Sequence, residues 1–132
     1  MGRILGLDYG QKRVGVAISD ENGINVFSRP AIQNRSQRQL FGELAKLVRG
    51  EQVAKIVVGL PLTMRGERGQ QAQHVQSIMC ELEEYLNVPV DFEDERLTSA
   101  YADRFPSAPS QDSVAAAALL ESYLERTRGG RQ

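Results

Sequence analysis

The chain has 132 residues, of which 41% are hydrophobic and 25% charged, and its formal net charge is −1. This composition is that of an ordinary globular domain, and it excludes a disordered chain and a strongly basic protein that coats nucleic acid non-specifically. The single cysteine, Cys80, excludes an internal disulfide and favours a reducing compartment, so we expect one cytoplasmic domain over residues 1–132.

The first predicted element is a strand over residues 4–7 that ends at a carboxylate, Asp8. Its unbroken apolar run indicates a central strand that is covered on both faces. An ionised aspartate at such a position is costly unless it reaches water, a hydrogen-bond donor or a metal ion. Asp8 is therefore either an acceptor for the backbone of its own turn or a functional carboxylate, and residue types alone leave both alternatives open.

Two further strands make the first part of the chain a meander. Residues 14–19 alternate large and small side chains, as a strand with two different faces does. The dipeptide Asn22-Gly23 predicts a tight type I′ hairpin turn after this strand. The run 24–32 contains a proline, which favours an antiparallel strand at the edge of the sheet.

The rest of the chain alternates helical patterns with apolar strands. Apolar spacing predicts helices over 36–50, 70–86, 97–104 and 112–126, and short apolar runs predict strands over 55–59 and 88–93. Strands that are separated by helices run parallel to one another. We therefore expect an α/β fold with a mixed five-stranded sheet, three strands antiparallel and two parallel, flanked by helices, and a flexible basic tail at about 127–132.

Acidic residues follow the strands at the edge where open α/β sheets bind ligands. Asp8 ends the first strand, and Asp94 and Glu95 follow the last one, so parallel neighbouring strands would bring these acids together. Asp112 extends the stripe of the last helix that faces the sheet, although it could also be the helix N-cap, a role open equally to Ser110. Three acids on one edge suit Mg²⁺ or Mn²⁺, and two such ions about 4 Å apart would favour phosphodiester hydrolysis.

Four motifs resemble the signature blocks of the YqgF family: LGLDYGQKRVGVAISD, VVGLPLTMRGERG, FEDERLTSAYA and DSVAAAALLESYLE. Members of this family are described as Holliday junction resolvases and as pre-16S ribosomal RNA nucleases with an RNase H-like fold. The resemblance implies a metal-dependent endonuclease whose catalytic and metal-binding acids are Asp8, Glu95 and Asp112, with Asp94 as the alternative to Glu95. Residues 101–111 depart from the family pattern, because this segment is shorter and has proline and serine in place of lysines.

Side chains in these motifs are expected to contact the phosphates of a nucleic acid: Tyr9, Lys12, Arg13, Arg65, Arg68 and Arg96. The family favours a ribosomal RNA precursor as the substrate, with a branched DNA junction as the alternative. A resolvase that cuts two strands symmetrically would act as a two-fold homodimer, and Leu60, Leu62 and Met64 could contribute to its interface. We expect no membrane partner, because the sequence shows neither a signal peptide nor an apolar run of about 20 residues.

Two other classes of function are compatible with parts of the chain. The nucleotide-binding domains of actin-like proteins and sugar kinases also open with a strand, a glycine turn and a second strand. Those proteins enclose the nucleotide between two such domains, whereas 132 residues provide one. A non-catalytic RNA-binding module for ribosome assembly would keep the fold and bind RNA without cutting it.

Overall fold

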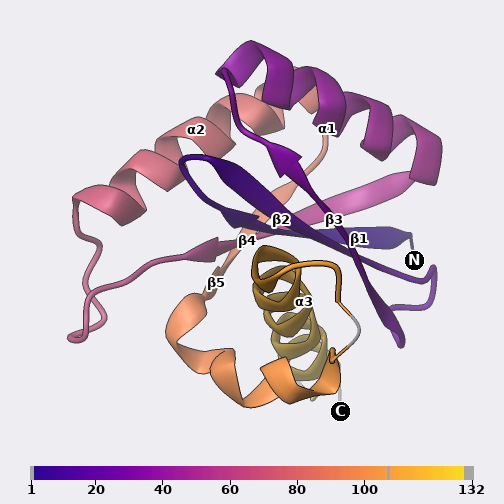
Figure 1. Cartoon of the computed structure of the whole chain (residues 1–132), viewed down its shortest axis with the longest axis vertical. Coiled ribbons are helices and arrows are strands. Elements are labelled where there is room, and N and C mark those ends of the chain that lie inside the picture. Colours follow the sequence, from indigo (N-terminus) through magenta and orange to yellow (C-terminus); the bar gives the residue numbers. More distant parts are fainter. Residues whose placement is uncertain (1, 107, 130–132) are drawn as a thin grey trace.

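The computed structural model describes residues 2–106 and 108–129 of the chain. The strands are β1 (Arg3–Tyr9), β2 (Arg13–Ser19), β3 (Val26–Gln33), β4 (Val53–Leu60) and β5 (Val90–Asp94), and the long helices are α1 (Gln37–Glu51), α2 (Gln70–Leu86) and α3 (Gln111–Gly129). Two short 3-10 helices, η1 (Glu95–Leu97) and η2 (Ser99–Arg104), connect β5 to α3. The sheet lies between two helical layers, with α1 and α2 over one face and α3 over the other (Figure 1). None of the helices in these ranges is long and apolar enough to span a bilayer.

The strand order is β3-β2-β1-β4-β5, with β1 at the centre of the sheet. β1 pairs with β2, and β2 with β3, in antiparallel fashion, whereas β1, β4 and β5 are parallel. The predicted mixed sheet of five strands is confirmed. Because β1, β4 and β5 are parallel, they end at the same edge of the sheet, which we call the acidic edge because Asp8, Asp94 and Glu95 lie there.

Three expectations about local structure differ from what is observed. No tight type I′ turn joins β2 to β3, because Gly23 has positive φ and Asn22 does not; the Asp20 carboxylate instead accepts hydrogen bonds from the loop backbone at positions 24 and 25. The helix expected over 97–104 is two 3-10 helices. Residues 127–129 of the expected tail belong to α3, where the Thr127 hydroxyl donates to the Tyr123 carbonyl, and residues 130–132 lie outside the described ranges.

Glycines in the two central strands let α3 lie directly against the sheet. A Cβ added at Gly6 of β1 would lie 3.0 Å from the Cβ of Leu120 and 3.1 Å from the carbonyl oxygen of Ala116. A Cβ added at Gly15 of β2 would lie only 1.9 Å from the carbonyl oxygen of Asp112. The backbone of α3 therefore rests on these positions, and a larger residue at position 15 would push the start of the helix away from β1.

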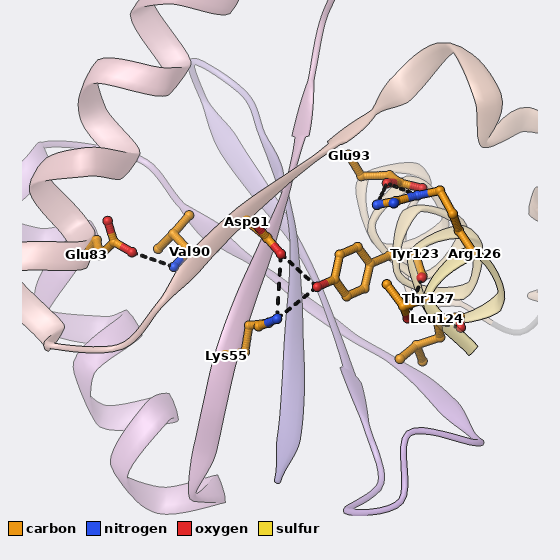
Figure 2. A network of polar contacts seen from close by, with 9 residues as sticks. All are labelled: Lys55, Glu83, Val90, Asp91, Glu93, Tyr123, Leu124, Arg126 and Thr127. Atoms are coloured by element: carbon orange, nitrogen blue, oxygen red, sulfur yellow. Dashed lines mark hydrogen bonds and ion pairs between the residues drawn. The ribbon is translucent and has the colours of Figure 1, made fainter. Parts of the chain in front are cut away.

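The C-terminal half of α3 is held to β4 and β5 by polar contacts, which Figure 2 shows from close by. The Tyr123 hydroxyl donates to Asp91 at 2.8 Å and accepts from Lys55 at 3.0 Å. Glu93, which is 3% exposed, accepts a 2.6 Å hydrogen bond from Arg126. With its start resting on β2 and its end tied to β5, α3 has a defined position relative to the acidic edge.

Candidate active site

Asp8 lies near the end of β1, on the face covered by α3, and is paired with Gly15 of β2. Burial of its side chain, a hydrogen bond with Glu95 and the negative charges of Glu95 and Asp112 raise the pKa of Asp8 from 3.8 to about 8. Asp8 and Glu95 therefore share a proton at neutral pH through this hydrogen bond. The hydrogen bonding of Asp8 is to another acid rather than to the backbone of its own turn, which agrees with the functional alternative for this carboxyl.

Glu95, rather than Asp94, is the acid that reaches Asp8. Side chains alternate along β5, and Asp94 points to the face opposite α3. There its carboxylate accepts from the guanidinium and the backbone N–H of Arg96, and these hydrogen bonds lower the pKa of Asp94. Glu95 follows at the start of η1 and turns back over Gly59 of β4, where an added Cβ would lie 2.8 Å from the Cγ of Glu95. The absence of a side chain at Gly59 leaves the space through which Glu95 reaches Asp8.

Asp112 lies in the first turn of α3. The hydroxyl of Ser110 accepts a hydrogen bond from the backbone N–H of Ser113 at 3.2 Å, so Ser110 caps this helix and Asp112 does not. The Asp112 carboxylate instead accepts a 3.0 Å hydrogen bond from Nε of Arg13. Its charge nevertheless contributes to the raised pKa of Asp8, so the two carboxylates lie within electrostatic reach of each other.

Two of the three predicted acids are therefore in contact, and the third is paired with an arginine. Within residues 2–106 and 108–129, no group of three or more Asp, Glu, His or Cys side chains is close enough together to hold a metal ion. The donors fit a hard divalent cation in their chemistry, because all three are carboxylates.

The cationic side chains predicted to bind phosphates lie around the same edge. Lys12 and Arg65 are exposed, and neither takes part in an ion pair within the described ranges. Arg68 donates to a glutamine side chain of α2 at 3.3 Å. Arg96, besides its pair with an aspartate, donates to the carbonyl oxygen of Met64 at 3.2 Å and so braces the loop between β4 and α2. Arg96 and Arg13 therefore already have acidic partners, whereas Lys12 and Arg65 have none among the residues that the structure describes.

Two predicted positions lie elsewhere than expected. Tyr9 follows Asp8 in β1 and therefore points to the opposite face, where it packs on the core and meets the ring of exposed His74 edge-on at 6.3 Å. The side chain of Tyr9 therefore does not face the acids. Leu60, expected as an exposed contributor to a dimer interface, is 6% exposed and belongs to the interior, whereas Met64 is 93% exposed.

The two glycines that build the site, Gly15 and Gly59, were not identified as site residues from the sequence. Each stands inside an apolar strand, where glycine is unfavourable unless another chain segment approaches closely. That signal was present, but the approaching segments, the start of α3 and the side chain of Glu95, are distant in sequence. Only the fold connects these glycines to the acids that they accommodate.

Comparison with known proteins gives a consistent result. A family model described as RuvX, Holliday junction resolvase, matches residues 2–126. A protein of Chloroflexus aggregans is 40% identical over 134 residues, covering 95% of this chain and 94% of the relative. A protein of Sulfurihydrogenibium is 36% identical over 135 residues, covering 96% and 92%. Both relatives carry the provisional name pre-16S rRNA nuclease.

The fold is shared with a solved resolvase. RuvC of Thermus thermophilus, in a structure with its Holliday junction substrate, superposes with a TM-score of 0.67 and covers 98% of this chain and 97% of its own. The sequences are 10% identical, so this likeness concerns the fold alone. The RNase H-like architecture that the four motifs imply is confirmed.

Proposed function

Because the chain belongs to the RuvX family, which is the YqgF family that its motifs resemble, we propose that it is a metal-dependent endonuclease that processes the 5′ end of pre-16S ribosomal RNA. The observation that supports this proposal most is the contact of Asp8 with Glu95, with Asp112 in electrostatic reach. A buried carboxyl with a raised pKa, next to two other acids at the end of parallel strands, is typical of a functional site.

Asp8, Glu95 and Asp112 would hold Mg²⁺ or Mn²⁺. We propose two such ions. Bound cations of this kind stabilise the attacking water and the leaving oxygen of a phosphodiester. Asp8 would release its proton to solvent on holding a cation, because the positive charge would offset the acidic neighbours that disfavour the ionised carboxylate.

Asp112 and Arg13 change partners in this proposal. When the Asp112 carboxylate turns to the cation site, the guanidinium of Arg13 is released beside the acids. A free guanidinium donates paired hydrogen bonds to phosphate oxygens. Arg13 therefore contributes to substrate binding only once the acids are loaded, whereas exposed Lys12 and Arg65 are available throughout.

A second candidate is the resolution of Holliday junctions, which the description of the matching family names. An acid-bound metal site can hydrolyse either RNA or DNA, so the substrates differ in shape and in 2′-hydroxyls rather than in the chemistry of cleavage. A resolvase makes two symmetric cuts and needs a two-fold dimer, which gives the two candidates different oligomeric requirements.

The test compares a pre-16S RNA fragment that carries its 5′ extension with a four-way DNA junction, each incubated with the protein and Mn²⁺. We expect cleavage of the RNA at a defined position and none by the Asp8→Asn variant. Paired symmetric nicks in the junction, made by a dimer, would favour the second candidate. RNA binding that survives Asp8→Asn without cleavage by the parent protein would instead indicate a non-catalytic assembly module.

A further inference from the structure

A groove of about 920 Å³ lies between the edge strand β3 and helix α1. Three of its lining side chains are cations, Arg35, Arg38 and Lys46, and all three are exposed. Over the ranges that the structure describes, none of them forms an ion pair. Glu43 also lines the groove, and its carboxylate accepts a hydrogen bond from Gln39. The groove therefore presents positive charge that no ion pair among the described residues neutralises.

Gly42 lines the same groove from the middle of α1. Glycine destabilises a helix interior relative to alanine, yet an added Cβ at Gly42 would meet no atom within 4 Å. Packing therefore does not require glycine at this position. The missing side chain instead leaves the groove open beside the helix.

The groove begins at the acidic edge. The end of β3 pairs with Arg13, and the following residue, Asn34, donates its backbone N–H to the carbonyl of Lys12 at 2.8 Å. Arg35 comes next in the chain, so its position is tied to the turn that carries Lys12 and Arg13. Arg13 in turn contacts Asp112. Positive charge thus extends from the acids, through this turn, to the groove.

We propose that the groove between β3 and α1, through Arg35, Arg38 and Lys46, binds the sugar–phosphate backbone of the substrate beyond the position of cleavage. This inference rests on the proposed function, in which the substrate is a nucleic acid. Residues 37–46 of α1 extend about 14 Å along the helix axis, which matches the rise of about four nucleotides. A polyanion neutralises the charge of all three cations. A second copy of this chain would instead bury them against its own three cations.

The test measures the equilibrium dissociation constant for the RNA fragment and for the junction, over a series of salt concentrations, in the cleavage-deficient Asp8→Asn protein. Each phosphate contact contributes a slope of about 0.7 to 0.9 in log K against log salt, which is a factor of about five to eight at 0.1 M. Arg38→Gln with Lys46→Gln should therefore weaken binding about 25- to 60-fold and lower the slope by about 1.4 to 1.8. Gly42→Gln should weaken binding by filling the groove, and Gly42→Ala should not.

Arg49→Gln is the matched control, because Arg49 is an exposed cation of the same helix that does not line the groove. It should leave both affinity and slope unchanged. Equal affinity and slope for the Arg38/Lys46 double variant and its parent would overturn the proposal. A dimeric parent protein that becomes monomeric in the double variant would also overturn it. Failure of the proposed function gives a different result: no cleavage by the protein with Asp8 intact, while the groove variants still weaken nucleic-acid binding.

Discussion

Replacement of Asp8 by asparagine should stabilise the metal-free protein at neutral and alkaline pH. In the folded chain Asp8 titrates at about 8, and in a solvated chain at 3.8, so between these values the folded state holds a proton that the unfolded state has lost. Stability falls with rising pH wherever the folded state binds more protons. The wild-type protein should therefore lose stability from about pH 4 to pH 8, and Asp8→Asn, which cannot titrate, should not.

The size of this effect follows from the two pKa values. Each pH unit between them corresponds to about 1.4 kcal/mol, which gives an upper limit of about 5 to 6 kcal/mol for the whole interval. Asp8 is half-buried and shares its proton with Glu95, so part of this energy is screened or relaxed. The free energy of unfolding of Asp8→Asn minus that of the wild-type protein should be about 2 to 3 kcal/mol larger at pH 8 than at pH 4.5.

The assay is urea unfolding in the presence of EDTA at pH values from 4.5 to 8.5, followed by circular dichroism. Asp20→Asn is a control of opposite sign, because hydrogen bonds from the backbone of Ile24 and from Asn25 lower the pKa of Asp20. Its loss should destabilise the protein by an amount that stays constant from pH 4.5 to 8.5, because the stabilisation from Asp20 is lost only as the pH falls below 3.8. If the difference in free energy of unfolding between Asp8→Asn and the wild-type protein stays constant over the whole pH range, the desolvated, acid-paired state of Asp8 is refuted.

Three further predictions concern the same site. Mn²⁺ affinity, measured by isothermal titration calorimetry, should rise by up to about tenfold per pH unit from pH 6 to 8 and level off above pH 8, because binding releases the Asp8 proton. An affinity independent of pH would contradict this. Gly15→Ala should cost about 1 to 3 kcal/mol of stability and abolish cleavage, because the backbone at the start of α3 must move. Gly59→Ala should cost less stability and only slow cleavage, because it displaces the flexible side chain of Glu95. Equal unfolding midpoints for the two variants would count against this distinction. Arg13→Gln should tighten Mn²⁺ binding, because it frees Asp112. It should also lower the slope of log K against log salt concentration for substrate binding by about 0.7 to 0.9. Looser Mn²⁺ binding would show that Arg13 instead organises the acids.

Periodicity was sufficient for much of the fold. The predicted helix 70–86 has the bounds of α2, because its apolar side chains repeat at helical spacing between a glycine N-cap and Asn87 in left-handed conformation. Ser36 at the start of α1 forms a capping box with Gln39, so that boundary also follows from local chemistry. The central place of β1 follows from its lack of a polar face.

The details of the site could not be obtained in the same way. Whether Asp94 or Glu95 faces Asp8 depends on a single residue of register, at the point where β5 passes into a 3-10 helix. The partner of Asp112 is Arg13, which is 99 residues away in the chain, and no local pattern connects the two. Such contacts arise from the way α3 packs on the glycines of β1 and β2, and therefore from tertiary structure.

The most direct test of the account uses the two neighbouring acids at the end of β5. Single-turnover cleavage with saturating Mn²⁺ should be abolished by Glu95→Gln and retained by Asp94→Asn, because only Glu95 contacts Asp8 while Asp94 is bound to Arg96 on the opposite face. Full activity of Glu95→Gln, or its loss in a folded Asp94→Asn protein, would show that the acids do not form the proposed site.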